Sequence, residues 1–348
     1  MVEPISLALL VCQRSADRSG ATWAAVFTPW LDLRLVVSDA AKGIAAGLAG
    51  AAFAQGRGGN GRSPIRHGLD VFHTNQHANR ALRRPWRIAI SASAAAAVAA
   101  GKVADAKRSG RDARSVAAPA RVAREHAEAC LAELERQHVA WQRARAALTL
   151  FRPNGTLNDR EYAEGEIQAA VVELTGPDWQ KTRNALTDRR ALTFLDDLHE
   201  RLRTAVPDDA LRAACVQRWS LRHHRPTTNA TTADGSIDAV LNEVIRNGPL
   251  NAVEQAAYDQ VRHIIRTTVR ASSAVEGINS VLRMHQGRHR KMTQGMLDLK
   301  RLYWNCRRPT SGRRKGKSPY ELLGVALPST DFWALLARSP RPTETLSN

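Results

Sequence analysis

Residues 270–283 say the most about the fold of this chain, and they read Arg270-Ala271-Ser272-Ser273-Ala274-Val275-Glu276-Gly277-Ile278-Asn279-Ser280-Val281-Leu282-Arg283. Ser273 precedes Glu276 by three residues, the spacing of a helix-opening capping box, and no proline follows before Leu282. In this helix one face would carry a carboxylate, an amide, a hydroxyl and a guanidinium, from Glu276, Asn279, Ser280 and Arg283. A neighbouring apolar face, made of Val275, Ile278 and Leu282, would pack on a core.

Such a polar face can offer an oxygen ligand to a hard cation with a phosphate-binding group beside it. A Ser-x-x-Glu pair caps helices more often than it binds metal. The charge of the neighbouring residues is therefore needed to distinguish a helix cap from a metal ligand. From Arg262 to Lys317 the chain has fifteen Lys or Arg and two acids, Glu276 and Asp298. A single carboxylate in a strongly basic segment favours phosphate chemistry. The basic residues expected to contact DNA are Arg288, Arg290, Lys291, Arg307, Arg308, Arg313, Arg314, Lys315 and Lys317.

The segment 272–283 resembles the region around the third acidic residue of bacterial insertion-sequence transposases of the DDE class. Four downstream motifs resemble the same family at consistent spacing, and together with this segment they fall within residues 272–324. They are Gly295-x-Leu297-x-Leu299, Tyr303-x-Asn305-x-Arg307, Arg314-Lys315-Gly316-Lys317-Ser318-Pro319 and Glu321-Leu322-Leu323-Gly324.

The N-terminal region predicts a strand–helix–strand order. Ile5 to Val11 is a short apolar run typical of a buried strand, Ser19 to Trp30 favours a short helix, and Leu33 to Val37 favours a second strand. Asp39 follows that strand, at the end where ligands gather in α/β sheets. By position alone, Asp39 or Ser38 would more often cap the next helix, residues 40–53.

The resemblance adds a role for Asp39. The stretch Leu35-Val36-Val37-Ser38-Asp39-Ala40-Ala41-Lys42-Gly43 is similar to the segment that carries the family's second acidic residue, at the end of a strand of an RNase H-like fold. The resemblance therefore implies that Asp39 and Glu276 are catalytic and bind metal, with Ser38 left to cap the helix. Asp70-x-x-His73 resembles a motif that follows the second acid in related families. It implies a supporting role for Asp70 and His73, beside Asn279 and Arg283.

The reaction implied is DNA strand cleavage and transfer with Mg²⁺ or Mn²⁺, in which divalent cations activate a water or a 3′-hydroxyl and stabilise the leaving oxygen. The family's first Asp has no counterpart, since Val2 to Leu7 resembles the family's third strand and the chain starts there. We therefore expect an N-terminally truncated copy with an incomplete catalytic set. The alternative is a non-catalytic DNA-binding remnant of a transposase, and a basic helical RNA-binding scaffold is a weaker third.

Composition agrees with a nucleic-acid partner, because the 348 residues carry a formal net charge of +18. Double-stranded DNA with terminal inverted repeats is the expected partner, in a possible homodimer. The four cysteines have no paired spacing and favour a reducing compartment, and no apolar run approaches a membrane span. A cytoplasmic, nucleoid-associated protein without membrane contact is predicted.

Taken together, the sequence predicts an α/β fold, with an RNase H-like core incomplete at the N-terminus and a large all-α insertion, so that the whole is predominantly helical. The predicted domains are 1–74, the N-terminal part of the core; 75–268, the helical insertion; 269–338, the C-terminal part with the basic segment; and 339–348, a tail. Prolines that punctuate the helical stretches support the insertion. Its tryptophans Trp141, Trp179 and Trp219 are expected to fill a helical core rather than to stack on bases.

Overall fold

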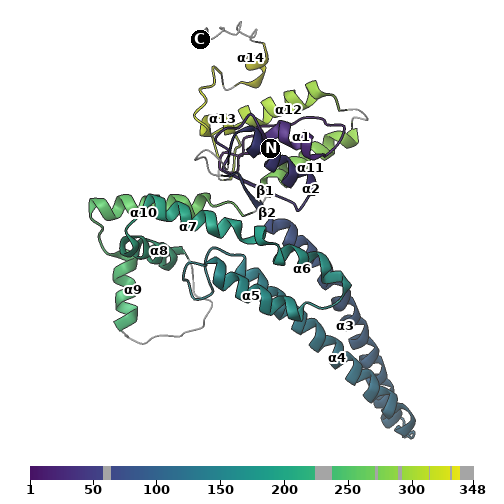
Figure 1. Ribbon diagram of the computed structural model, residues 1–348. Helices are drawn as coiled ribbons and strands as arrows, with labels where there is room; N and C mark the ends of the chain where they lie inside the picture. Colours follow the sequence, from purple (N-terminus) through teal and green to yellow (C-terminus); the bar gives the residue numbers. More distant parts are fainter. Residues whose placement is uncertain are drawn as a thin grey trace, which may run out of the picture. The chain divides into compact units, whose positions relative to one another are not determined.

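The computed structural model describes residues 1–57, 64–223, 237–270, 273–288, 292–312, 314–329 and 331–337, and the chain forms two compact units (Figure 1). Unit 1 comprises Met1–Arg34, Ala41–Ile65 and Ala271–Asn348, and unit 2 comprises Leu35–Ala40 and Arg66–Arg270. The described residues are mostly helical, and their strands form a single two-stranded parallel sheet. The predicted predominance of helix is confirmed. An RNase H-like sheet of more than two strands is not seen in the part of the chain that the structure describes.

Unit 1 is built from helices contributed by both ends of the chain. They are α1 (Gly20–Phe27), α2 (Lys42–Ala54), α11 (Ser273–Arg288), α12 (Gln294–Cys306), α13 (Pro319–Leu322) and α14 (Phe332–Leu336). Ser19 caps α1 by accepting a hydrogen bond from the Thr22 backbone N–H, and Thr293 does the same for α12 through Met296. Phe332 of α14 packs edge-on against Tyr303 of α12, with ring centroids 5.2 Å apart.

Helices α1 and α2 approach each other closely because α2 carries glycines on the contact face. A Cβ placed on Gly47 would lie 2.3 Å from Cβ of Trp23, and one on Gly43 would lie 2.1 Å from the carbonyl oxygen of Arg18. No side chain fits at either position without moving backbone atoms. The glycine spacing in 43–47 therefore sets the distance between these two helices.

The segment predicted as a buried strand, Ile5 to Val11, is not a strand in the structure. Leu7 has φ of 59°, a left-handed conformation that breaks an extended run at a non-glycine residue. Side chains of α12 satisfy the backbone instead. The buried Asn305 accepts from Leu9 N–H at 2.8 Å and donates to the Leu9 carbonyl at 3.1 Å, and the Trp304 indole donates to the Leu7 carbonyl at 2.9 Å. An amide side chain has one donor group and one acceptor, so Asn305 takes up both backbone groups of Leu9, while backbone groups of Met1 and Glu3 pair with Ala8, Leu10 and Val11.

Unit 2 contains the sheet. Strand β1 (Leu35–Ser38) pairs in parallel with β2 (Arg66–Leu69), with Leu35 opposite Arg66 and Ser38 opposite Leu69. The strand predicted at Leu33 to Val37 is thus confirmed, within the usual uncertainty of element boundaries. Strand β2 was not predicted, because Arg-His-Gly-Leu lacks the β-branched alternation of a strand.

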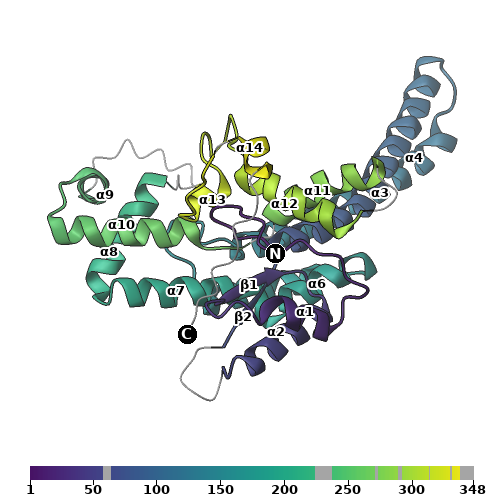
Figure 2. The same ribbon diagram turned by 90° about the horizontal axis from the view of Figure 1, so that it is seen from above.

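The rest of unit 2 is helical. Its α-helices are α3 (Val71–Arg108), α4 (Arg114–Ala147), α5 (Arg160–Glu173), α6 (Gln180–Thr187), α7 (Thr193–Ala205), α8 (Asp209–His223), α9 (Ile237–Asn247) and α10 (Ala252–Thr267), with short 3₁₀ turns η1 (Pro177–Trp179) and η2 (Arg189–Leu192). Helices α3 and α4 pair as a long hairpin, visible in both ribbon views (Figures 1 and 2).

Two apolar clusters hold unit 2 together. The first contains residues of helices α3 through α7 and is centred on Trp141 and Trp179. Their ring centroids lie 6.5 Å apart, and the Trp179 indole donates to Gln137 at 2.8 Å. The second joins α7, α8 and α10, and Trp219 packs against it, stacked between Phe151 and His223. The expectation that these tryptophans fill a helical core is confirmed.

The middle of α3 is apolar and largely exposed, and by length and composition it could cross a membrane. Its uncharged run, residues 88–101 between Arg87 and Lys102, spans only about 21 Å as a helix, whereas a hydrocarbon core is about 30 Å thick.

Candidate functional site

The carboxyl ends of β1 and β2 bring two acidic residues to one edge of the sheet of unit 2. Asp39 follows Ser38 and Asp70 follows Leu69, and these two strand residues are register partners. The Asp70 N–H donates to the Ser38 carbonyl at 2.9 Å, which extends the ladder by one step. The sequence predicted Asp39 at a strand end, but it did not predict that Asp70 occupies the matching position on the neighbouring strand.

Asp70 is committed to the start of α3. Its side chain is 0% exposed, and its Oδ1 accepts from the Phe72 N–H at 2.8 Å. Its Oδ2 lies 3.6 Å from Nε2 of His73, a partly exposed residue one turn along the helix. The structure therefore brings together Asp70 and His73, the pair that the resemblance assigns a supporting role. In this structure Asp70 acts as the N-cap of α3.

A chain of polar side chains lies behind Asp39. The Ser38 hydroxyl donates to the Asp39 carbonyl at 2.8 Å and lies 2.8 Å from His67 Nε2. Nδ1 of His67 is 3.2 Å from a guanidinium nitrogen of Arg190, which Asp188 holds through two oxygens. Arginine can only donate, so Nδ1 accepts and the proton of a neutral His67 sits on Nε2, pointing at Ser38. Burial, followed by the charge of Arg190, lowers the pKa of His67, which favours this neutral form.

The direction of this hydrogen bond excludes His67 as a base for the Ser38 hydroxyl, and the contacts of Ser38 correct its predicted role as a helix cap. His67 donates to Ser38, so it does not act as the base that would activate the Ser38 hydroxyl in this arrangement. Ser38 was expected to cap the following helix, which is wrong. The N-cap of α2 is Ala41, without a side-chain hydrogen bond, because the Ser38 hydroxyl is engaged with Asp39 and His67. The hydrogen bonds from Ser38 through His67 to Arg190 instead hold the backbone around the exposed Asp39 in place.

The second predicted carboxylate, Glu276, lies in the first turn of α11 in unit 1. Ile278 on this helix is buried, Glu276 and Asn279 are half-buried, and Ser280 and Arg283 are exposed. The Ser280 hydroxyl donates to the Gly277 carbonyl of its own helix at 2.8 Å. The predicted division into an apolar and a polar face is therefore seen in part, at the buried Ile278 and at the exposed Ser280 and Arg283. The helix begins at Ser273, whose side chain lies outside the described residues.

The predicted DNA-contacting residues of unit 1 fall into three groups. Arg307, Lys315 and Lys317 are exposed. Arg308 pairs with Glu321 through Nε at 2.9 Å, and Arg314 lies over the Trp304 ring, 5.6 Å from its centroid. Burial, followed by the charge of Arg307, lowers the pKa of Arg314. Outside the described residues lie Arg290, Lys291, Arg313 and the side chain of Arg288.

Arg308 has a structural role that the sequence did not reveal. Its partner Glu321 also closes the capping box of α13, accepting from the Ser318 N–H at 2.8 Å. The Arg308 guanidinium first, and the Ser318 backbone second, lower the pKa of Glu321 to about 2. Glu321 of α13 thus binds both Arg308, near the start of the 307–317 segment, and Ser318, which follows its end.

A divalent cation needs several oxygen ligands at one point. Among the described residues, no three His, Cys, Asp or Glu side chains are grouped so that they could hold a metal. Asp70 is committed to its cap, and Asp39 and Glu276 belong to different units. Neither unit on its own therefore fits the expected Mg²⁺ or Mn²⁺.

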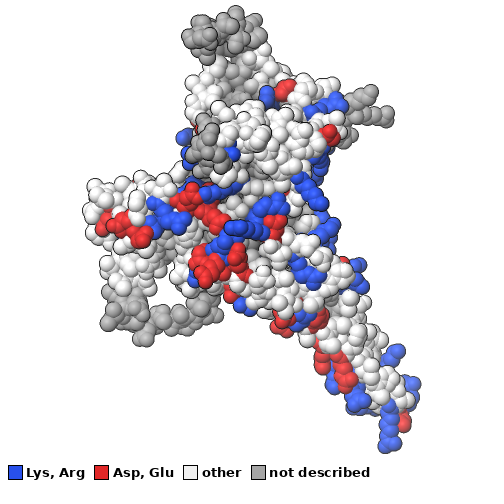
Figure 3. All heavy atoms as spheres, in the orientation of Figure 1, with Lys and Arg blue, Asp and Glu red and all other residues white. Residues whose placement is uncertain are grey.

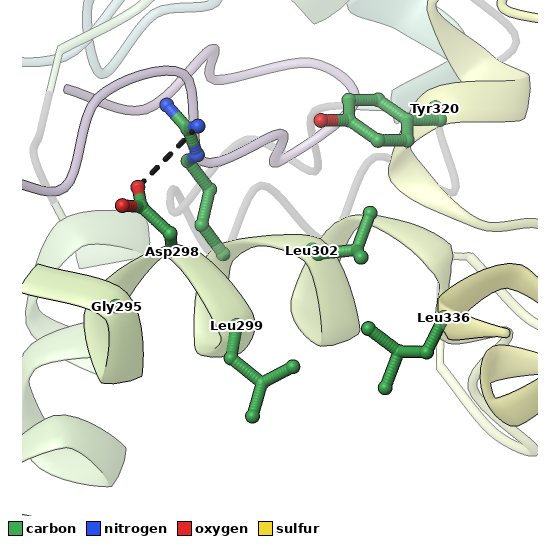
Figure 4. Close-up of a pocket in the computed structure, with 7 residues that line it drawn as sticks. Gly295, Asp298, Leu299, Leu302, Tyr320 and Leu336 are labelled. Carbon is green, nitrogen blue, oxygen red and sulfur yellow. Dashed lines mark ion pairs between the residues drawn. The ribbon is translucent and has the colours of Figure 1, made fainter. Parts of the chain in front are cut away.

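Unit 1 also has an open hollow of about 370 Å³, and Glu276 is not among its lining residues. Helix α12 contributes most of its lining, with Tyr320 of α13 and Leu336 of α14 (Figure 4). One side carries the ion pair of Asp298 and Arg301 at 3.5 Å, and the rest is mainly apolar. None of the residues predicted to act on DNA lines it.

Comparisons of the chain with protein-family models, with curated proteins and with solved structures found no match. Function therefore has to be argued from the residues and their geometry.

Proposed function

We propose that this protein acts on DNA as a transposase of the DDE class, with Asp39 and Glu276 as its candidate catalytic carboxylates. The observation that carries the proposal is the β1–α2–β2 arrangement, which sets Asp39 at the carboxyl end of a parallel strand. Carboxylates at this edge of a parallel sheet are well placed for ligand binding. The resemblance of the segments around Asp39 and Glu276 to the same family, at the expected order along the chain, supports the assignment.

Charge supports the choice of partner. The net charge of +18 favours a polyanion, and the exposed Arg307, Lys315 and Lys317 are suited to phosphate contacts. These side chains carry no sequence preference by themselves, because phosphates are the same at every base pair. The terminal inverted repeats would have to be distinguished by contacts to base edges.

A second function is DNA binding without cleavage. The observation that favours it is the position of Asp70, whose buried carboxylate is taken up by the α3 cap. Asp39 is then the exposed acid at the strand ends, and a single carboxylate is a poor site for Mg²⁺. Binding needs only the basic surface.

The test is nicking of DNA that carries the flanking inverted repeats, with Mg²⁺ or Mn²⁺, by wild type, Asp39→Asn, Glu276→Gln and Glu161→Gln. Glu161 is a matched control, since it is an exposed glutamate in the first turn of α5. Metal-dependent nicking that Asp39→Asn and Glu276→Gln abolish, and Glu161→Gln leaves intact, is the expected result. Binding of the repeats without nicking by any form would favour the second function. Absence of both binding and nicking would overturn both.

A further inference from the structure

The first half of α3 carries an acid-free basic face. Between Asp70 and Asp105 the chain has no Asp or Glu, while Arg80, Arg83, Arg84 and Arg87 fall within eight residues. All four arginine side chains are exposed. Spacings of three and four residues bring them to one side of the helix, because they match its repeat of about 3.6 residues.

The buried side of α3 lies opposite. Thr74, Ala78, Ala81 and Ala89 face the core of unit 2, so the arginines point away from it. The exposed line runs through Arg80, Arg83 and Arg87 and continues to the half-buried Gln76, and the exposed Asn79 and Trp86 lie next to it. The Trp86 side chain is 56% exposed.

The arginines of this face are mostly not neutralised. Among the described residues, Arg80, Arg83 and Arg87 form no ion pair, and Arg80 donates to Gln76 at 3.3 Å. Arg84, at the flank, lies 3.5 Å from Asp178. Figure 3 shows Lys and Arg along the α3 edge of the arm, where acidic side chains are sparse.

The neighbouring surface has the same sign of charge. His77 lies on α3 one turn before Arg80, and its pKa is lowered by burial first and then by the charges of Lys181 and Arg80. Lys181 is an exposed residue of α6. Lys181 of α6 therefore adds a positive charge close to His77 on this part of α3.

We propose that this face of α3, defined by Gln76, Asn79, Arg80, Arg83, Trp86 and Arg87, binds the backbone of double-stranded DNA. The inference rests on the proposed action on DNA and adds a second contact surface, in unit 2. Its composition fits the partner: arginines bind phosphates, Asn and Gln can bind phosphates or base edges, and an exposed tryptophan can lie against sugars or bases.

The dimensions also fit a duplex. From Arg80 to Arg87 the helix rises by roughly 10 Å, and the major groove of B-DNA is about 12 Å wide. A helix laid across the groove can therefore reach phosphates on both of its sides. A protein partner would need carboxylates to match the arginines, whereas a duplex supplies a regular row of phosphates.

The experiment compares two double variants of the full chain. Arg83→Gln with Arg87→Gln removes two unpaired charges from α3. Arg121→Gln with Arg124→Gln removes the same charge from α4, where Glu125 and Glu128 lie 3.8 and 3.7 Å from the two arginines. Binding to a short random-sequence duplex is measured between about 50 and 200 mM salt.

Each phosphate contact adds about 0.9 to the slope of log affinity against log salt, so the α3 variant should lose about 1.8 from this slope. Over that fourfold change in salt, the affinity of wild type should fall by roughly 12-fold more than that of the α3 variant. The α4 variant should keep the wild-type slope, and Arg83→Lys with Arg87→Lys should keep most of it.

Other outcomes overturn the inference. Equal slopes for the α3 and α4 variants, with wild type binding DNA, would refute the α3 contact and leave the proposed function standing. Failure of wild type to bind any DNA would refute both. Loss confined to single-stranded DNA would refute the duplex as partner. Circular dichroism and urea unfolding of each variant separate loss of contact from loss of fold, since all the altered arginines are exposed.

Discussion

Helices α3 and α4 form one hairpin and are both rich in arginine, yet they differ in where their carboxylates lie. Helix α3 has seven Lys or Arg and one acid, whereas α4 has six arginines and four glutamates. On α4, Arg121 and Arg124 each have a glutamate four residues on, and Arg143 pairs with Glu166 of α5 at 2.6 Å. On the first half of α3 the ion pair of Arg84 with Asp178 is the single such contact among the described residues.

The difference shows that the same side chain serves two purposes. A paired arginine on an exposed helix contributes a few tenths of a kcal/mol to stability, and its hydrogen bonds are already partly used. An unpaired arginine contributes little to the fold and keeps all its donors for an anionic partner. We infer that the paired arginines of α4 stabilise the fold, whereas the unpaired arginines of α3 are available to an anionic partner.

The largest effect should come from Asp70, the one acid at the start of α3. Asp70→Ala should lower the free energy of unfolding by about 2 kcal/mol, because it removes the cap of a long helix and leaves the Phe72 N–H without its partner. Asp70→Asn keeps a capping oxygen and should cost less than about 1 kcal/mol. Urea unfolding measures both. Equal losses for the two variants would mean that the charge, rather than the cap, is what matters.

A glutamate at position 79 would give α3 an ion pair of the kind that α4 has. Asn79→Glu places a glutamate four residues before Arg83, the favourable orientation for an ion pair on a helix. It should weaken duplex binding and lower the salt slope by about 0.9 to 1.8, as the loss of one to two phosphate contacts would, while unfolding stability stays unchanged or rises by a few tenths of a kcal/mol. Asn79→Gln keeps the amide group and is the neutral control, and it should lose less affinity than Asn79→Glu. Unchanged affinity of Asn79→Glu would argue against the α3 contact.

The reverse change unpairs α4. Glu125→Gln with Glu128→Gln should lower unfolding stability by about 0.4 to 1 kcal/mol in total, because two helical ion pairs are lost. Arg121 and Arg124 are then released, and duplex affinity should rise slightly at low salt. A fall in affinity would contradict the division of roles between the two helices. Thermal unfolding and the same binding assay measure the two quantities.

The smallest effect concerns Arg308 in unit 1, a paired arginine like those of α4. Its partner Glu321 has an ordinary pKa of 4.5 and a folded pKa of about 2. A lowered folded pKa contributes stability that is present above pH 4.5 and is lost as the pH falls towards 2. Arg308→Gln should reduce the pH dependence of the urea midpoint in this window, with a small amplitude because the pair is exposed. An unchanged pH profile would show that the Ser318 contacts hold Glu321 without Arg308.

The sequence predicted the strands and helices that are determined by the pattern of apolar residues within the segment itself. Strand β1, helices α1 and α2 and the two-faced α11 follow from apolar periodicity and from caps, and Asp39 was expected at a strand end. Ile5 to Val11 had the apolar run of a strand, but Asn305 from the other end of the chain takes up both backbone groups of Leu9. Strand β2 had the opposite outcome, since pairing with β1 makes a strand of a weakly patterned segment.

For the candidate site, too, the sequence showed some features and the structure alone showed others. The residue types and spacings around Asp39, Asp70, His73 and Glu276 were visible in the sequence. The link from His67 to Arg190 was not, because these residues are more than a hundred positions apart and no motif joins them. The burial of Asp70 was also hidden, since an Asp before a helix is usually at the surface.

The sequence by itself determined the net charge, the helical periodicity and the absence of acids from 71–104, because each is a property of residue order alone. Only the tertiary structure decided which arginines are paired, which carboxylate is buried and which backbone groups Asn305 satisfies. An ion pair or hydrogen bond needs its atoms within about 4 Å, and for residues far apart in the chain that distance is set by packing. The acid-free stretch thus becomes an exposed basic face only because α3 turns its alanines to the core.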